Sequence, residues 1–201
     1  LGDASRAVKL LTSKNPYHSL KIAEELNKEN EKRKLITQNM ENEAISMVEE
    51  ELNLDMKRSI VLYKEGWNAG IIGILASRIK ELYNRPTIII SIIDEVCKGS
   101  CRSIPQFDIV NALKSCNSYL DGFGGHPMAA GLTIERKNLD SFASKFENSC
   151  SSLLTKDNLI PSIYIDCKVD FSDINSRLIN FLKYLAPFGP KNSKPKFLST
   201  E

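Results

Sequence analysis

Residues Asp121–Gly131 read Asp-Gly-Phe-Gly-Gly-His-Pro-Met-Ala-Ala-Gly and contain one of the chain's two histidines. Glycine lacks a Cβ, so such a stretch lets a ligand or a second backbone come close, and successive N–H groups in a turn can bind an anion. His126 adds a ring that can donate to a phosphate oxygen. The stretch predicts either a phosphate-binding turn or a tight structural turn that leads into a strand at Leu132–Ile134.

Strands and helices alternate around this stretch. The β-branched run Thr87–Ile93 is typical of a central strand covered on both faces. Further strands are predicted at Ser59–Tyr63 and Val96–Ser103, and helices at Asn68–Tyr83, from Asp108 to about Leu120, and from Leu139 to about Leu154. This order predicts an α/β fold. A strand at Ile160–Val169 and a helix at Ser172–Tyr184 follow, ahead of a proline-rich end.

A long helix is predicted before this alternating region. From Tyr17 to about Leu52 the chain has no glycine or proline, and apolar residues recur near the period of a helix. The middle, Asn27–Lys34, is almost entirely charged or amide-bearing. A helix that is amphipathic at both ends and polar in its middle is typical of a connector between domains; the alternative is a surface helix of one domain.

The strand Val96–Ser103 carries a polar face. Lys98, Ser100 and Arg102 alternate with Cys97, Gly99 and Cys101, so the two sets point to opposite sides. Two cations with a hydroxyl between them suit a phosphate backbone, and the planar guanidinium of Arg102 can bind it in a bidentate manner. The alternative is an exposed edge strand with solvated side chains.

Trp67 and Asn68 lie where the helix Asn68–Tyr83 begins. Asn68 is a suitable cap, and the first N–H groups of a helix can bind an anion. Trp67, the only tryptophan, could stack on a base, although a single tryptophan also suits a core or an interface. Both residues, with Lys98, are further candidates for the binding site.

Composition restricts the class of protein. The net charge of +2 gives no sign of a broad basic surface, so a nucleic-acid site must be local. The five cysteines show neither a disulfide framework nor zinc spacing and are expected to be reduced, mostly buried thiols. No segment is long and apolar enough to span a membrane, and no secretory signal is recognisable. We expect a cytoplasmic protein and expect the chain to be part of a longer one.

Three separated pieces of the chain resemble the DHHA1 domain of the RecJ family, whose members are 5′→3′ single-strand-specific DNA exonucleases of the DHH phosphoesterase superfamily. They are Gly66–Ile74 with Ala76–Arg78, Gly99–Ser103, and Phe123–His126 with Ala129–Gly131. The Gly-Gly-His piece is shared across the superfamily, whereas the other two point to RecJ. The resemblance implies a mixed β-sheet flanked by helices.

The resemblance also implies a domain order: residues 1–15 are the tail of a DHH domain, 16–56 the connector helix, 57–155 the DHHA1 domain, and 156–201 the beginning of an OB-fold domain. Ser100, Arg102 and Ser103 would contact the 5′-phosphate end or backbone of the strand, and Gly124, Gly125 and His126 would hold the nucleotide. Two residues depart from the family pattern: Asn68 stands where histidine is common, and Gln106 where glycine is common.

The catalytic residues implied by the resemblance lie upstream, because the superfamily's metal ligands belong to the DHH domain. No Asp-His-His motif occurs in this chain, so we expect no metal ligand here, Mn²⁺ or Mg²⁺ in the DHH domain, and no activity from this part alone. The expected partner is single-stranded DNA, with a single-strand-binding protein or a helicase as further partners of a monomer acting in DNA repair and recombination. The alternatives are a phosphodiesterase acting on oligoribonucleotides or a cyclic dinucleotide, and a non-catalytic nucleic-acid-binding module.

Overall fold

The computed structural model describes residues 3–199, so Leu1 and Gly2, the start of the expected DHH tail, lie outside the described residues. The chain divides into two compact units, Leu1–Ile160 and Pro161–Glu201. Each unit is described by itself.

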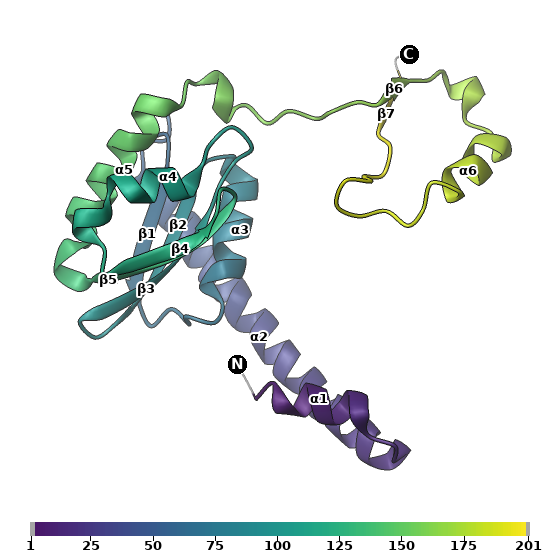
Figure 1. Cartoon of the computed structure of the whole chain (residues 1–201), viewed down its shortest axis with the longest axis horizontal. Coiled ribbons are helices and arrows are strands. Elements are labelled where there is room, and N and C mark those ends of the chain that lie inside the picture. The colour runs from purple at the N-terminus through teal and green to yellow at the C-terminus, as the bar shows by residue number, and fades with distance from the viewer. Residues whose placement is uncertain (1–2, 200–201) are drawn as a thin grey trace. The chain divides into compact units, whose positions relative to one another are not determined.

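The first unit is built on one five-stranded mixed sheet (Figure 1). Its strands are β1 (Ile60–Glu65), β2 (Thr87–Ile93), β3 (Val96–Arg102), β4 (Gly122–His126) and β5 (Ala129–Glu135), in the order β1-β2-β3-β5-β4. β1 and β2 are parallel, and the other neighbours are antiparallel. The expected α/β fold with a mixed sheet is confirmed.

Helices cover both faces of this sheet. On one side α3 (Ile72–Tyr83) packs on β2 and β3, with α2 (Pro16–Glu51) behind it; on the other side lie α4 (Ile109–Ser115) and α5 (Leu139–Leu153) (Figure 1). A hydrophobic core lies on each face of the sheet, and β2 contributes to both. Ile88 and Ile90 face α4 and α5, whereas Ile89 faces α3. Both cores are built mainly from fully buried aliphatic residues, which is the dominant source of their stability.

The long helix is present nearly as predicted. Asn15 begins it, because its side-chain oxygen accepts from Tyr17 N and His18 N while Pro16 occupies the first helical position. The shorter α1 (Ser5–Thr12) precedes it. None of the helices among residues 3–199 is long and apolar enough to cross a membrane.

Three predicted elements differ in the structure. The glycine-rich stretch is not a turn: Gly122–His126 is itself an edge strand, and only Pro127 and Met128 separate it from β5. α3 begins at Ile72 rather than directly after Asn68, because a turn occupies the residues between them. The helix expected from Asp108 to Leu120 ends at Ser115 and is followed by a 3-10 turn, Asn117–Tyr119.

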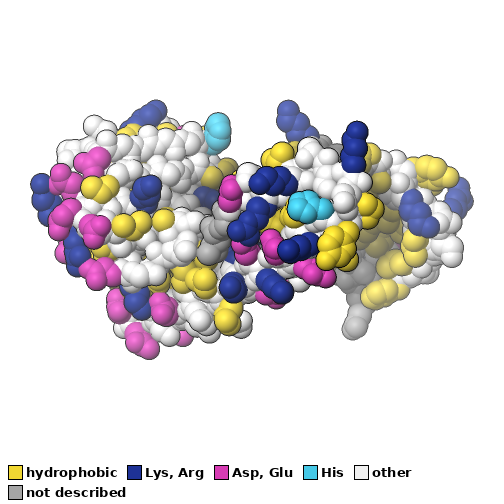
Figure 2. All heavy atoms as spheres, turned by 90° about the horizontal axis from the view of Figure 1, so that it is seen from below, with side chains coloured by type: hydrophobic (Ala, Val, Ile, Leu, Met, Phe, Trp, Pro, Cys, Tyr) yellow, Lys and Arg dark blue, Asp and Glu magenta, His cyan; other side chains and the backbone are white. Residues whose placement is uncertain are grey.

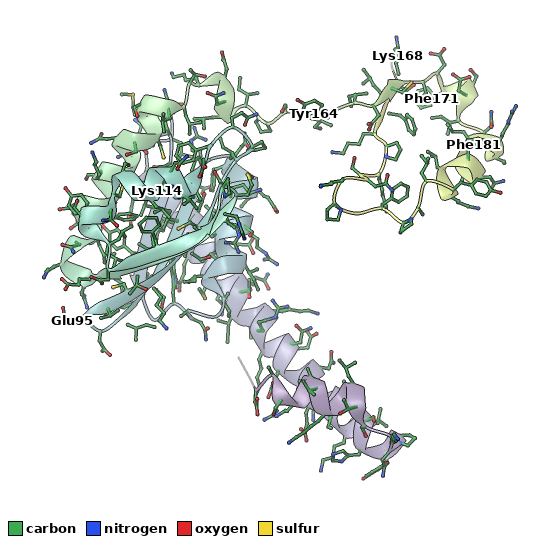
Figure 3. The ribbon with its side chains drawn as sticks, viewed as in Figure 1. Glu95, Lys114, Tyr164, Lys168, Phe171 and Phe181 are labelled. Atoms are coloured by element: carbon green, nitrogen blue, oxygen red, sulfur yellow. The ribbon has the colours of Figure 1, made fainter. Side chains whose placement is uncertain are left out.

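The second unit is small and has no core of its own in the described range. It contains β6 (Cys167–Lys168), α6 (Ser176–Lys183) and β7 (Phe197–Leu198), with β6 and β7 parallel. None of residues 161–199 is buried, and aromatic side chains such as those of Tyr164, Phe171 and Phe181 project from the ribbon (Figure 3). The strand predicted at Ile160–Val169 is therefore wrong over most of its length, since only Cys167 and Lys168 pair.

Candidate nucleic-acid interface

The predicted polar face of β3 lies in register with the glycine-rich hairpin. β5 pairs with β3 on one side and β4 on the other, so residues of β5 have partners in both strands. The resulting rows are Lys98–Thr133–Gly122, Ser100–Gly131–Gly124 and Arg102–Ala129–His126. Because side chains alternate along a strand, all three rows lie on the same face, the face that carries α3. The structure thus brings Lys98, Ser100, Arg102, Gly124 and His126 together.

A groove runs over this face beside the start of α3. Its volume is about 580 Å³. One side of the groove, called the wall below, is formed by Ala69, Gly70, Ile72 and Gly73. The remaining lining residues are Lys98, Gly99 and Ser100 of β3 and Gly122, Phe123, Gly124, Gly131, Leu132 and Thr133 of the β4–β5 hairpin. A Cβ on Gly122 or Gly124 would meet nothing within 4 Å. The floor of the groove is therefore open backbone, which a ligand can approach closely.

The guanidinium of Arg102 is held against α3. Its Nε donates to Ser77 Oγ at 3.0 Å, and its Nη1 donates to Ser100 Oγ at 3.1 Å and to the carbonyl of Cys101 at 2.8 Å. A Cβ on Gly73 would lie 3.3 Å from Nη2, so glycine at this position leaves room for the side chain. Arg102 is half-buried, and three donor contacts within the protein fix its plane.

Lys98 and His126 are the exposed cationic and titratable groups of the rows. Lys98 lines the groove, whereas His126 ends β4 in the row that also holds Arg102. Neither side chain forms an ion pair or a hydrogen bond with any residue in the range 3–199. The ammonium group of Lys98 and the ring nitrogens of His126 are thus not engaged by other residues in this range. In contrast to the alternative considered above, β3 is an interior strand and not an exposed edge.

Gly125 belongs to the opposite face. Its φ is +151°, and a Cβ there would lie 2.4 Å from the carbonyl oxygen of Ala129 and 2.6 Å from Ala130 Cα. Only glycine fits, for a reason internal to the hairpin. Glycine at this position lets the hairpin close, and the expected role of Gly125 in holding the nucleotide stays a prediction.

The expected role of the Ser103 side chain in binding phosphate is wrong. It is 1% exposed, its hydroxyl donates to the carbonyl of Phe107 at 2.5 Å, and its N–H donates to the carbonyl of Met128 at 3.0 Å. Its side chain is fully used inside the protein and cannot reach a phosphate. Ser103 instead ties the end of β3 to the β4–β5 turn.

Trp67 cannot stack on a base, because it is 4% exposed and packs in the core beneath α3. Its indole N–H donates to Glu43 Oε2 at 2.9 Å. Asn68 does not cap α3 directly; its Oδ1 accepts from Gly70 N at 2.8 Å and shapes the turn before the helix. Both residues support the wall of the groove from behind.

Sequence reasoning missed the two residues of α3 that receive Arg102. Gly73 and Ser77 are one helical turn apart, so they lie on one face of α3. The Arg102 side chain lies against this face of α3. Thr133 and Gly131 were also missed, since their place in the rows depends on the pairing of β5.

The cysteines do not form a metal site. Within residues 3–199 no group of three or more His, Cys, Asp and Glu side chains could hold a metal ion. Cys97, Cys101, Cys116 and Cys150 are buried, whereas Cys167 is exposed. Burial raises the pKa of the Cys101 thiol to about 12, as expected for a thiol in apolar surroundings.

Comparison with known proteins gives two domain matches. The model of the DHHA1 domain matches residues 57–152, and that of the RecJ OB domain matches residues 165–201. The chain is 36% identical to the single-stranded-DNA-specific exonuclease RecJ of Bacillus subtilis over 197 residues, which cover 97% of this chain and 25% of that protein. It is 32% identical to the Escherichia coli protein of the same name over 204 residues, which cover 98% of this chain and 35% of that protein.

The fold agrees with these matches. The crystal structure of RecJ in complex with Mn²⁺ from Thermus thermophilus superposes with a TM-score of 0.85 at 24% identity, covering 98% of this chain and 28% of that one. The chain thus spans about a quarter to a third of the length of these relatives. The chain thus carries a DHHA1 domain followed by a RecJ OB domain, and it is similar to RecJ proteins along nearly its whole length.

Proposed function

We propose that this chain is the substrate-gripping part of a metal-dependent, single-strand-specific 5′→3′ DNA exonuclease that acts in DNA repair and recombination. The relatives named above are single-stranded-DNA-specific exonucleases, which supports this substrate class. The observation that carries the proposal is the set of three rows, in which Lys98, Ser100 and Arg102 face a glycine floor that ends at His126.

The rows suit a single strand for electrostatic and steric reasons. Lys98 and Arg102 supply two positive charges two rows apart, about 13 Å along β3. The ring of His126 and the free Nη2 of Arg102 supply directional donors to phosphate oxygens. The glycine floor admits a sugar or base at backbone distance, and the charged residues provide a salt-dependent grip that does not read sequence.

We place the hydrolytic chemistry outside this chain, in the DHH domain that the resemblance implies. Hydrolysis of this kind uses a divalent ion to polarise the phosphate and generate the attacking hydroxide, and Mn²⁺ or Mg²⁺ is the expected ion. The residues described here do not offer a ligand set for it, so no catalytic step is assigned to them. Their part is to bind and orient the strand.

The test uses the complete protein that contains this chain and measures the Kd for a single-stranded DNA oligonucleotide by fluorescence anisotropy. We expect Lys98→Ala and His126→Ala to weaken binding and to lower exonuclease turnover without changing the Tm. Lys114→Ala is the matched control, because Lys114 is exposed on α4 on the other side of the sheet (Figure 3). Equal effects of Lys98→Ala and Lys114→Ala would contradict the proposal, as would preferred binding of a short oligoribonucleotide or a cyclic dinucleotide.

The local character of the site fits the charge distribution. Basic and acidic side chains are interspersed on the face of the molecule shown in Figure 2, in keeping with a net charge of +2. Removing a single groove cation should therefore matter more than removing any one surface lysine elsewhere. This expectation separates a defined site from diffuse attraction to a polyanion.

A further inference from the structure

The wall of the groove is anchored through Trp67. β1 ends at Glu65, Gly66 turns the chain with φ +81°, and the wall residues Ala69 and Gly70 follow Trp67 after one residue. The carbonyl oxygen of Trp67 accepts from Ser91 Oγ at 2.6 Å. Its backbone is therefore tied to the interior strand β2, and its side chain packs in the core beneath the wall.

The other end of Trp67 is tied to the long helix. Its indole N–H donates to Glu43 Oε2 at 2.9 Å, and the same oxygen accepts from Lys64 Nζ at 3.0 Å. The Trp67 hydrogen bond, followed by that from Lys64, lowers the pKa of Glu43, so the carboxylate stays ionised at neutral pH. A charged acceptor makes a stronger hydrogen bond than a neutral one. The orientation of the indole is thus set from α2.

The turn between Trp67 and the groove is held by hydrogen bonds of its own. Asn68 Oδ1 accepts from Gly70 N at 2.8 Å, and the carbonyl oxygen of Asn68 accepts from Ile71 N at 2.9 Å. These two hydrogen bonds hold the turn that presents Ala69 and Gly70. A rotation of Trp67 would move the wall as a unit and would also displace Gly73, against which Arg102 is held.

We propose that Glu43 is a positioning residue of the groove: through Trp67 it fixes the wall at the start of α3, so that the long helix and the grip on nucleic acid are coupled. The inference rests on the proposed function, because it concerns the affinity of the same groove. The inference gives Gly66 and Trp67 a physical role: through them, the position of α2 determines the position of the groove wall.

A second carboxylate of α2 provides the internal control. Glu41 forms an ion pair with Arg78 of α3 and so also joins the two helices, but among the described residues it forms no hydrogen bond or ion pair with the turn that carries the wall. If Glu43 merely helped to pack α2 on the domain, loss of either carboxylate would have the same effect. If it positions the wall, only loss of Glu43 changes the affinity.

The experiment compares variants of the complete protein by Kd for single-stranded DNA and by Tm. We expect Glu43→Ala and Trp67→Phe each to weaken binding roughly tenfold, the equivalent of about one misplaced contact, and the double variant to be no worse than either. Glu43→Gln keeps an oxygen that can accept from Trp67 and should restore most of the affinity. Glu41→Ala should leave the Kd unchanged, whatever it does to the Tm.

The outcomes separate the two proposals. An unchanged Kd in Glu43→Ala, together with weak binding by Lys98→Ala, would overturn the positioning role and leave the groove in place. Equal losses in Glu41→Ala and Glu43→Ala would also overturn it, in favour of general packing. Unchanged binding in Lys98→Ala and His126→Ala would instead overturn the groove itself, and the inference with it.

Discussion

Arg102 and His126 share one partner: Ala129 of β5 is paired with Arg102 on β3 and with His126 on β4. Two strand spacings separate the backbones of Arg102 and His126, which is about 10 Å. The residue between them contributes only a methyl group on this face of the sheet. Under the proposed function, we expect this row to offer a phosphate group two kinds of donor, from strands that are not neighbours.

We expect Arg102 to contribute a positive charge and a guanidinium plane whose orientation is fixed by its bonds within the protein. Arg102→Ala should weaken binding of single-stranded DNA and reduce the slope of log K against log salt by about 0.7, the value for one phosphate contact on a single strand. Arg102→Lys should keep most of the slope but lose affinity, because lysine cannot maintain the bonds to Ser77 and Ser100. Anisotropy titrations at several salt concentrations measure both quantities. An unchanged slope in Arg102→Ala would remove this residue from the contact surface.

Gly73→Ala should separate stability from binding. Alanine is favoured over glycine by about 1 kcal/mol in a helix interior, and we expect a smaller gain at position 73, which lies in the first turn of α3. The added methyl would lie 3.3 Å from Arg102 Nη2 and Ser100 Oγ, so the end of the arginine side chain must shift. We expect an unchanged or higher Tm and a weaker affinity for single-stranded DNA. A lower Tm with normal affinity would show that Arg102 cannot move and that its seat serves the fold alone.

Gly124 and Gly125 are adjacent but should respond in opposite ways. Gly125→Ala forces a side chain into φ +151° and against the backbone of Ala129 and Ala130, so it should destabilise the protein by roughly 1–3 kcal/mol or more. Gly124→Ala points into open space over the groove, so it should leave the Tm nearly unchanged and weaken binding. Thermal unfolding and anisotropy on both variants check this pair. Equal loss of Tm in the two would contradict the assignment of the two faces.

Local sequence signals predicted several elements well. The β-branched run became β2 within its expected bounds, Thr87–Ile93, because a run of Ile and Thr suits a strand buried on both faces. The helix expected from Tyr17 to about Leu52 is α2, Pro16–Glu51. The alternation in β3 also placed Lys98, Ser100 and Arg102 on one face, since that periodicity is a property of the strand itself.

The remainder of the site depends on pairing between distant segments. Glycine has low strand propensity, so Gly122–His126 becomes a strand only through its bonds to β5. The hydrogen-bond partner of Trp67 is Glu43 of α2, and no local sequence pattern predicts that contact. Ser103 is different, because it follows Arg102 directly and the same alternation already puts it on the opposite face from Arg102. The two-residue alternation of β3 therefore argues against Ser103 as a residue of the binding face.

Cysteine reactivity offers a test of the core that is independent of DNA. The thiolate is the species that alkylates, and burial raises the pKa of Cys101 to about 12 and raises that of Cys150 as well. Iodoacetamide at about pH 8, just below the ordinary thiol pKa, should therefore modify only the exposed Cys167 in the folded chain and all five cysteines after unfolding. The Cys167→Ser variant should take up no label when folded.

The same burial predicts how stability depends on pH. Because the folded state keeps the Cys101 proton above about pH 9, where the unfolded chain loses it, stability should fall as the pH rises from about 9 towards 12. Chemical unfolding at a series of pH values measures this decline, and mass spectrometry of the alkylated protein measures which thiols are accessible. Modification of Cys101 in the folded chain near neutral pH would show that the core beneath β3 opens far more readily than its burial indicates.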